Sequence, residues 1–575
     1  MKKILLTSLF IASFSFAQTP NVYWVDVHNG NDGNNGLTSA TAFKTIQHIF
    51  SNTSSLFSSN VDTIKVMPSV TSSNPSGYYD FGDNEISLSA TSSNSRNFVM
   101  IGIAGADSTI FDAEEKNRHF QINSTQDAST IIQGIKFING KKDYAGGSFY
   151  FSNSKITFKN CIFQNNTISD QGGAIYISGQ STPSFESCSF ISNKVLTGNS
   201  DNTGEGGAIY IQNPSSDFSR SNPINFTNTK FISNYVLAGG SAYGGAIKAQ
   251  RKLNFTNCLF IKNHSTANTN DNNWDETLGG AIHADNWYSN GGQRVGLNMT
   301  IINSTFDGNY IKAMTDDKLN IMWGSTISYG RWEDSISPSA KTFIFNSIIR
   351  NSKIYTKSSI FSNQDNGRGD ILGAGSTQGY KLITDYNNIE DSTTESWAGD
   401  YTYDSEVGYK DTANGDYSLL DGSPMIGLGS ATWSDEGLTA PTKDILGVTR
   451  GSSPDMGAYE NALNASNAPL PVSGLSVVAI TSGAKLNWNK NKTSLTNSAL
   501  ASNIEYQIQK DSSGVKTTFT TSDTAYTFSN LKNGKTYTLT VSAKDTQSGN
   551  IGISSKAFTI SPRYLGPKWY VGAGS

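Results

Sequence analysis

Apolar and turn-forming residues recur at fixed distances from a phenylalanine in six segments of the chain. The six phenylalanines are Phe137, Phe163, Phe190, Phe231, Phe260 and Phe306. An apolar residue stands five positions before each phenylalanine, and a turn-forming residue stands three positions before it. Three positions after the phenylalanines stand Gly140, Asn166, Asn193, Asn234, Asn263 and Asn309. Each segment therefore predicts two short β-strands joined by a tight bend, and the repetition indicates a solenoid.

A second pattern, two glycines followed by a short apolar strand, alternates with the first. It occupies residues 146–151, 172–177, 206–211, 244–249 and 279–284. This pattern predicts a third strand in each coil. Because one coil cannot bury its own apolar face, coils must stack, with parallel strands about 4.8 Å apart. The predicted fold is all-β and begins with a right-handed parallel β-helix, whose handedness follows from the preference of parallel crossovers.

Stacking places equivalent residues of successive coils directly above one another. The phenylalanines then form an internal stack, and the asparagines form a ladder of amide hydrogen bonds from coil to coil. The three cysteines, Cys161, Cys188 and Cys258, share the position two before the phenylalanine, where two other copies have Thr229 and Ser304. They are therefore predicted to be small, buried core residues with free thiols.

The chain is less regular on either side of these copies. Residues 23–27 predict a strand, and residues 43–50 predict a helical cap that covers the open end of the stack. Further strands are expected at residues 63–66, 98–103 and 120–122. Residues 324–327 and 358–361 are interpreted as degenerate copies of the Gly-Gly strand.

A different pattern begins near residue 472. Half-buried strands are predicted at residues 475–478, 484–488 and 504–508. Tyr537 enters a further strand three residues after Gly534, which is the tyrosine-corner arrangement of β-sandwiches. Trp488 and this motif together resemble a fibronectin type III domain. The resemblance implies a β-sandwich that acts as a spacer or a weak binding module.

The Gly-Gly-Ala-Ile strands and Phe-x-x-Asn turns resemble the right-handed β-helix repeats of the pectin-lyase-like superfamily, including the chlamydial polymorphic outer-membrane proteins. The opening segment 23–26 and the closing segment 454–460 resemble the two ends of choice-of-anchor β-helix proteins of bacterial surfaces. Together these resemblances cover residues 20 to 461. They imply the fold but leave the activity open, because the superfamily includes lyases, hydrolases, adhesins and autotransporter passengers.

The start of the chain has the layout of a secretory signal peptide. Lys2 and Lys3 precede the apolar run 4–16, and Ser15 and Ala17 are small residues at the expected cleavage site. The predicted organisation is a signal peptide, a β-helix with an N-terminal cap, a linker, a fibronectin type III-like domain, and a linker or the start of a further β-helix. Their residues are 1–17, 18–461, 462–471, 472–562 and 563–575. The sequence is expected to be a fragment that lacks its anchor.

Composition and charge narrow the possible partners. The net charge is −4, only 16% of residues are charged, and no basic cluster occurs, which argues against nucleic acid as a partner. No window after the signal peptide is apolar enough to span a bilayer. The chain is therefore predicted to be secreted and extracellular, either free or attached to the cell surface.

One outward-facing line of side chains carries candidate chemistry. If the isoleucines of the Gly-Gly strands point inward, their next neighbours point outward and stack. We name this line the tyrosine row; its members are Tyr150, Tyr176, Tyr210, Lys248 and His283, with Ser328 and Phe361 beyond. Because aromatic rings present flat faces to sugar rings, the row predicts a binding site for a polysaccharide or a cell-surface glycan. The alternative interpretation is a structural ladder stabilised by tyrosine stacking.

The tyrosine row also contains the candidate catalytic residues. Lys248 and His283, together with Asp285, can bind an acidic sugar or remove a proton from it. Two functional hypotheses follow. The first is a non-enzymatic surface protein that adheres or binds glycan. The alternative is a polysaccharide lyase or hydrolase that acts on an acidic polysaccharide in a groove on the same face; it is less favoured because the Gly-Gly strands show no cluster of acidic residues.

A calcium site is the one cofactor hypothesis that the sequence offers. The segment 29–36 is rich in asparagine, aspartate and glycine, and Asp26 and Asp32 are the candidate ligands. Its spacing does not match the EF-hand loop. No other metal and no other cofactor is predicted.

Overall fold

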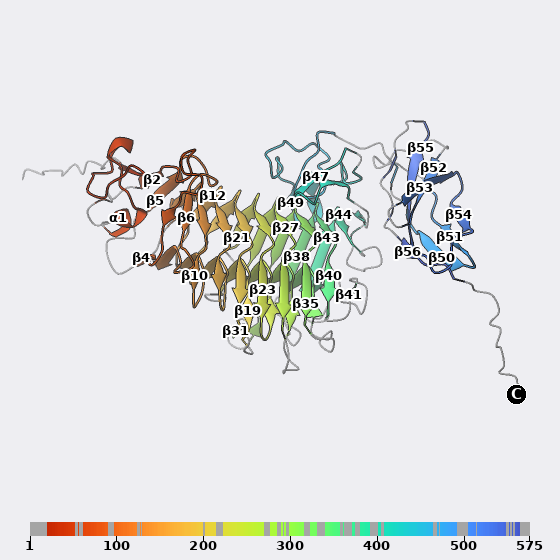
Figure 1. The fold of residues 1–575 in the computed structure, drawn as a ribbon, viewed down its shortest axis with the longest axis horizontal. Coiled ribbons are helices and arrows are strands. Elements are labelled where there is room, and N and C mark those ends of the chain that lie inside the picture. The colour runs from red at the N-terminus through yellow and green to blue at the C-terminus, as the bar shows by residue number, and fades with distance from the viewer. Residues whose placement is uncertain are drawn as a thin grey trace, which may run out of the picture.

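The computed structural model describes residues 20–563 with interruptions. The residues left out within this span are 52–55, 57–60, 90–96, 124–126, 128, 199–201, 214–221, 269–275, 285–288, 291–292, 295–297, 315–321, 330–339, 357–359, 362–370, 374–379, 391–398, 400, 404–406, 422, 464–468, 471, 492–503, 513–514, 548–550, 553–554 and 556–557. The predicted signal peptide, residues 1–17, lies outside the described residues. The described chain begins with long parallel sheets and ends with two antiparallel sheets of three and four strands, and three further antiparallel sheets have two strands each (Figure 1).

Three long parallel sheets form the wall of a β-helix, as predicted. Sheet A consists of β1 (Val22–Val25), β2 (Asp62–Val66), β5 (Phe98–Gly102), β8 (Ile131–Gln133), β12 (Thr157–Lys159), β16 (Ser184–Glu186), β21 (Ile224–Thr227), β26 (Leu253–Thr256), β33 (Met299–Ile302), β38 (Ala340–Phe345) and β43 (Tyr380–Asp385). Sheet B consists of β3 (Tyr79–Asp80), β6 (Ile110–Asp112), β9 (Lys136–Ile138), β13 (Ile162–Gln164), β17 (Ser189–Ile191), β22 (Lys230–Ile232), β27 (Leu259–Ile261), β34 (Thr305–Asp307), β39 (Ile348–Arg350), β44 (Asn387–Ile389) and β45 (Thr402–Tyr403). Sheet C consists of β4 (Ile86–Ser89), β7 (Phe120–Asn123), β11 (Phe149–Ser152), β15 (Ile175–Ser178), β20 (Ile209–Ile211), β25 (Ile247–Ala249), β30 (Ile282–Ala284), β37 (Ile327–Tyr329) and β42 (Ile371–Gly373).

Two smaller sheets lie between sheets B and C in the order of the chain. Sheet D consists of β10 (Lys141–Lys142), β14 (Thr167–Ile168), β18 (Lys194–Leu196), β23 (Tyr235–Ala238), β28 (His264–Ala267), β35 (Tyr310–Ala313), β40 (Lys353–Tyr355) and β41 (Ile360–Phe361). Sheet E consists of β19 (Gly204–Glu205), β24 (Ala242–Tyr243), β29 (Thr277–Leu278) and β36 (Met322–Trp323). Val236 of sheet D and Ala242 of sheet E share a small buried core. In each middle coil, the chain therefore passes from sheet B through a strand of sheet D and a strand of sheet E before it reaches sheet C.

The interior of the β-helix is filled by two stacks of phenylalanine rings. Centroids of Phe163 and Phe190 are 4.7 Å apart, and the same stack continues through Phe231 and Phe260 at 4.9 and 4.6 Å. A second stack, on sheet A, consists of Phe158, Phe185, Phe226 and Phe255. All these rings are buried. The prediction that the phenylalanines stack inside the solenoid is confirmed.

The asparagine ladder is also present. Each side-chain amide donates to the side-chain oxygen of the next asparagine, over 2.8 Å from Asn166 to Asn193 and 2.9 Å from Asn193 to Asn234. The ladder then continues through Asn263 to Asn309 at 3.0 Å per step. All five side chains are buried. These amides satisfy backbone groups at a corner where the chain changes direction and would otherwise leave them unpaired.

The bend before each phenylalanine depends on a left-handed backbone conformation. The turn-forming residues Asn160, Ser187, Asn228, Asn257 and Asn303 have φ between 46° and 53°. Asparagine tolerates this region better than most residues because its short side-chain amide can form hydrogen bonds with the nearby backbone. The preference for asparagine at this position is thus a requirement of the backbone.

The three cysteines are buried free thiols, as predicted. Burial raises the pKa of the Cys258 thiol to about 12 and also raises the pKa of Cys188. We expect none of the three thiols to react with a thiol reagent in the folded protein, because the thiolate is the reactive form. All three should react after denaturation. A loss of two hydrogens in non-reducing mass analysis would contradict this expectation by revealing a Cys161–Cys188 bridge.

The N-terminal end of the solenoid is closed by α1 (Ile46–Ser51), which lies at the red end in Figure 1. Ile46 and Ile49 are fully buried in the same core as the first coils. The ring of Phe50 packs edge-on against Phe98 at 5.2 Å. The predicted helical cap is confirmed, although its helix starts three residues later than the sequence pattern suggested, because Phe43 still pairs with Val25.

His119 is buried in the early coils and provides a test of acid sensitivity. Burial lowers the pKa of His119 from 6.5 to about 3. The unfolded chain therefore binds this proton more readily, so stability is lost as the pH falls from about 6.5 towards 3. By linkage, this loss amounts to about 3 kcal/mol at pH 4. A His119→Met variant should lose less stability between pH 7 and pH 4 in denaturant titrations; equal losses in both proteins would contradict this assignment.

One of the two degenerate Gly-Gly copies is correctly identified. Strand β37, which follows Gly324, pairs in parallel with β30 in sheet C. The other interpretation, at residues 358–361, is wrong, because β41 pairs antiparallel with β40 in sheet D. The next strand of sheet C is β42, which places Leu372 rather than Phe361 beside Ser328. A two-residue apolar match is too short to distinguish these sheets.

After the last coils, the chain folds back over the corner between sheets A and B. This closing segment, residues 407–463, contains β46 (Tyr409–Asp411), β47 (Asp416–Leu419), β48 (Thr432–Trp433), the 3-10 helix η4 (Ser434–Glu436) and β49 (Leu438–Thr439). The left-handed asparagines of successive coils bind it directly. Asn257, Asn303 and Asn346 donate to the carbonyl oxygens of Lys443, Asp455 and Ser430 at 2.7, 3.0 and 2.8 Å. The segment therefore joins several coils along their side.

Arg450 lies at the centre of the contact between the closing segment and the coils. Its guanidinium forms a buried ion pair with Glu460 at 2.8 Å. It also donates to the Asn257 side-chain oxygen at 3.0 Å and to the Gly457 carbonyl at 3.0 Å. The motif at residues 454–460 is thus a structural clasp between the segment and the coils.

The C-terminal part of the described chain is a sandwich of two antiparallel sheets. One sheet contains β50 (Ser476–Ile480), β51 (Gly483–Asn487) and β54 (Ala525–Ser529); the other contains β52 (Ile504–Ser512), β53 (Val515–Thr521), β55 (Tyr537–Asp545) and β56 (Phe558–Ile560). Trp488 and Tyr506 pack edge-to-face at 5.2 Å in the core. The Tyr537 hydroxyl accepts a hydrogen bond from the Lys532 backbone N–H at 3.0 Å, which is the contact that a tyrosine corner requires.

Candidate functional site

The tyrosine row lies on sheet C in the predicted register. Tyr150 pairs with Tyr176, and Tyr176 pairs with Tyr210. Lys248 and His283 follow on the next two strands. The tyrosine rings are stacked with centroids 5.3 and 5.1 Å apart. The sequence therefore identified which residues stand in line.

The row is not the open face that the sequence suggested. Tyr176 and Tyr210 are 7% and 5% exposed, while Lys248 and His283 are 1% and 2% exposed. Part of the cause is Tyr243 of sheet E, which stacks on His283 at 5.2 Å and lies 5.5 Å from the Lys248 ammonium. The expectation of exposure at these four residues is therefore wrong, and among the members of the row whose burial the structure describes, only Tyr150 is partly exposed.

The electrostatics of the row reflect its burial. Burial, with smaller contributions from Tyr150, Asp170 and Glu205, raises the pKa of Tyr176 well above its ordinary value. Burial also raises the pKa of Asp170. A stacked ring between two others has both faces covered, so Tyr176 cannot place a face against a sugar. The contacts therefore fit the structural-ladder interpretation, and a ligand-binding role remains a hypothesis.

The N-terminal end of the row is bordered by a charged cluster. The Arg118 guanidinium lies 3.1 Å from Glu85 and 5.5 Å from the Tyr150 ring centroid. Lys142 also approaches Glu85, at 3.3 Å. Glu85 is thus shared by two cations, so these three side chains together carry one net positive charge.

The remaining candidate residues are less informative. Asp285 lies outside the described residues. The Asp26 carboxylate accepts hydrogen bonds from the backbone of His28 and Asn29, while that of Asp32 accepts from the backbone of Lys44 and Thr45. Both aspartates thereby organise turns near α1. Among the described residues, no group of three or more His, Cys, Asp or Glu side chains is placed to hold a metal ion.

A second row of side chains, which the sequence interpretation missed, lies on the outer face of sheet D. We name it the sheet D row; along the strand register it comprises Lys194, Tyr235, His264, Tyr310 and Lys353. Ring centroids are 5.0 Å apart between Tyr235 and His264, and 4.5 Å apart between His264 and Tyr310. All five residues are partly exposed. Each stands four positions after its phenylalanine or, for Lys353, after Ile349, so the repeat alignment contained the signal.

The central histidine of this row is neutral at ordinary pH. Burial lowers the pKa of His264 to about 4, with a further contribution from the charge of Lys312. Burial also raises the pKa of Tyr235 and Tyr310. His264 therefore adds no positive charge to this face near neutral pH.

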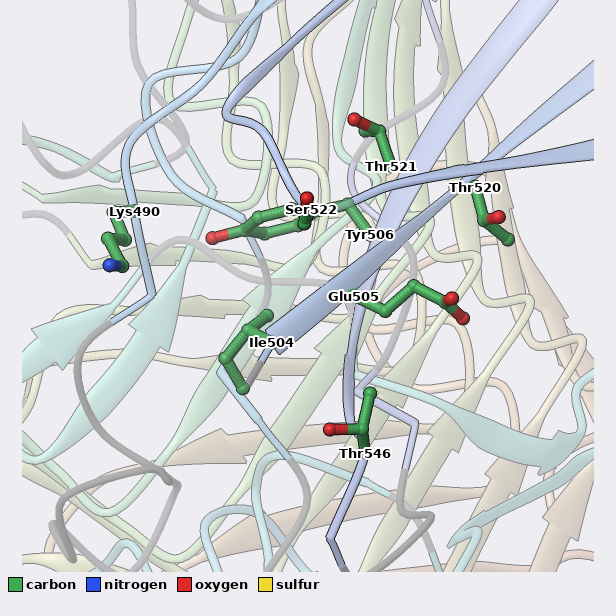
Figure 2. A pocket seen from close by; sticks show the side chains of 8 residues that line it. All are labelled: Lys490, Ile504, Glu505, Tyr506, Thr520, Thr521, Ser522 and Thr546. Carbon is green, nitrogen blue, oxygen red and sulfur yellow. The ribbon is translucent and has the colours of Figure 1, made fainter. Parts of the chain in front are cut away.

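A polar hollow of about 400 Å³ lies on the sandwich (Figure 2). It is lined by Lys490, Ile504, Glu505, Tyr506, Thr520, Thr521, Ser522 and Thr546. Its hydroxyl-rich lining comes mainly from β52, β53 and the end of β55. The hydroxyl of Tyr506 already accepts a hydrogen bond from the backbone N–H of Asn491 at 3.0 Å.

Comparison with known families gives one match. Residues 160–178 match the Chlamydia polymorphic membrane protein repeat. This stretch runs from the left-handed residue Asn160 through Phe163 and Asn166 to the end of β15, and therefore corresponds to most of one coil. No curated protein matches the chain. In the described part of the chain, no helix is both long and apolar enough to cross a membrane.

Solved structures similar to parts of the chain share little sequence with it. Domains d3-d4 of the rat CD45 extracellular region are 18% identical over 16% of this chain and 49% of that chain, with a TM-score of 0.14. The FN5 domain of Drosophila Lar is 14% identical over 16% of this chain and 97% of that one, with a TM-score of 0.14. A fibronectin type III domain derived from the human KIAA0970 protein is 15% identical over 18% of this chain and 84% of that one, with a TM-score of 0.15. This chain thus spans about half of the CD45 fragment.

Proposed function

We propose that the chain is an exported bacterial surface protein that binds glycan through an exposed face of its β-helix without catalysis. The observation that supports this most directly is the match of one coil to the Chlamydia polymorphic membrane protein repeat. In addition, the long parallel sheets repeat the same coil in register. A solenoid of this kind offers an extended lateral surface of the type that repeat proteins use for binding.

Catalysis is not part of the proposal. Lys248 and His283, the candidate bases of a polysaccharide lyase, are 1% and 2% exposed and packed against Tyr243. A general base must come within hydrogen-bond reach of the proton that it removes. A polymer cannot approach these two side chains while Tyr243 and its strand hold their places.

We further infer that the β-helix is of the pectin-lyase-like type and that residues 472–562 form a fibronectin type III-like spacer. Two observations support the spacer: its two sheets have three and four strands, and the Tyr537 hydroxyl accepts a hydrogen bond from the Lys532 backbone N–H. A fragment of residues 472–562 should unfold at the same temperature as the corresponding transition of the whole chain. A fragment that fails to fold would contradict the proposed boundary.

Surface display is tested in the bacterium that encodes the chain. An antibody against residues 472–562 should label intact cells or detect the protein in the medium, since the signal peptide directs export. The matched control is the same chain without residues 1–17, which should remain inside the cell and escape labelling. Retention of the complete chain in the cytoplasm would overturn the proposal.

A further inference from the structure

The sheet D row has lysines at both ends and aromatic rings between them. Lys194 and Lys353 stand four strand steps apart, which corresponds to roughly 19 Å at the spacing of parallel strands. The intervening residues Val195, Val236 and Ile354 point inward and are buried, so the row itself faces outward. Lys312 and Tyr355 belong to the neighbouring outward row of the same sheet.

Among the residues that the structure describes, these lysines have no acidic partner. In the part of the chain that the structure describes, no carboxylate lies within ion-pair distance of Lys194, Lys312 or Lys353. By contrast, Lys141 and Lys159, on coils nearer the N-terminus, pair with Glu115 and Glu186 at 3.3 and 2.8 Å. A cationic face on a chain of net charge −4 is a local feature that overall composition conceals.

Because the three aromatic rings of the row are stacked, their ring edges and the two tyrosine hydroxyl groups are the parts that can contact a ligand. Both faces of the His264 ring are covered by Tyr235 and Tyr310. The imidazole contacts Thr266 at 3.1 Å, which fixes its orientation. Hydroxyl groups of Tyr235 and Tyr310 can donate to oxygen acceptors while the stacked rings keep the row straight and stiff.

We propose that the outer face of sheet D binds an anionic polysaccharide, laid along the solenoid axis, through Lys194, Lys312, Lys353 and the hydroxyls of Tyr235 and Tyr310. Charge complementarity identifies the occupant: separated cations on a straight row fit a polymer with carboxylate or sulfate groups at intervals. The inference rests on the proposed glycan-binding function and names its face and its ligand class.

The test compares two triple variants with the same change in charge. Lys194→Glu/Lys312→Glu/Lys353→Glu removes the cations of sheet D, while Lys516→Glu/Lys532→Glu/Lys535→Glu alters exposed lysines on the sandwich. Binding of the exported chain, residues 18–575, to immobilised polygalacturonate, dextran sulfate, neutral dextran and single-stranded poly(dT) is measured at several salt concentrations. We expect binding to at least one anionic polysaccharide and none to dextran. The sheet D variant should bind at least tenfold more weakly, whereas the sandwich variant should keep its affinity within about twofold.

Several outcomes would overturn the proposal. They are equal losses in the two variants, preferential binding to poly(dT), and no binding to either anionic polysaccharide. Should the glutamate variant fail to fold, Lys194→Gln/Lys312→Gln/Lys353→Gln provides the same comparison with a smaller perturbation. Surface labelling of cells with no binding to these polymers would refute the sheet D proposal while leaving surface display intact.

Discussion

Replacement of Asn234 by leucine is expected to destabilise the β-helix by roughly 3 to 6 kcal/mol. The Asn234 side-chain oxygen accepts from the backbone and side chain of Asn193 at 3.0 and 2.9 Å, and its amide donates to Asn263 and to the Phe190 carbonyl. All these groups are buried, and each one left unpaired costs about 1–3 kcal/mol. Leucine fills a similar volume, so the loss isolates hydrogen bonding.

The matched control for this substitution is Asn225→Ala in the same coil. Asn225 accepts a hydrogen bond from Asn254 at 2.9 Å on the exposed surface of sheet A. Because water can replace that partner, its loss should change stability by no more than about 0.5 kcal/mol. Denaturant titration of both variants checks the pair, and comparable losses would show that the ladder contributes no more than a surface contact.

The second large effect is expected at the clasp of the closing segment. Arg450→Met leaves the Glu460 carboxylate buried without its cation and also removes donors to Asn257 and Gly457. Breaking a buried ion pair in this way typically costs about 3–5 kcal/mol. We expect the closing segment to detach first, so proteolysis in residues 407–463 should become faster before the coils unfold.

A double variant separates the ion pair from the packing around it. In Arg450→Met/Glu460→Leu no unpaired charge remains, so stability should recover part of the loss seen in Arg450→Met. Failure to recover would show that the hydrogen bonds to Asn257 and Gly457 matter more than the charge of Glu460. A normal rate of proteolysis in Arg450→Met would contradict the clasp altogether.

Much of the fold was predictable because a stacked coil imposes its requirements at every turn. Phe163 and Asn166 recur at fixed offsets, so the register, the phenylalanine stack and the asparagine ladder followed from one alignment. The burial of Lys248 and His283 could not be predicted in this way, since Tyr243 of sheet E contacts both side chains and the two-residue strands of that sheet leave no periodic signal. The clasp could not be predicted either, because Arg450 and Asn257, which share a hydrogen bond, are 193 positions apart in the sequence.

The exposure of side chains on sheet D could not be predicted from the sequence pattern either. Tyr235, His264 and Tyr310 occupy one repeat position, but no Gly-Gly pair marks their strands as one marks the strands of the tyrosine row. Exposure depends on which side of a strand another sheet covers, and local alternation does not reveal it. The signal of the sheet D row lies four positions after each phenylalanine, where Lys194, Tyr235, His264 and Tyr310 stand.

The uniform register makes the coil a unit that evolution can add or remove whole. Deleting residues 189–229 would bring Cys188 next to Lys230, and Phe231 would then stack on Phe163 as Phe190 does now. Asn166 would likewise meet Asn234, so neither internal row would be interrupted. Each such event would shorten or lengthen the molecule by about 4.8 Å. The length of the solenoid can therefore change in steps of one whole coil, while the phenylalanine stack and the asparagine ladder stay continuous.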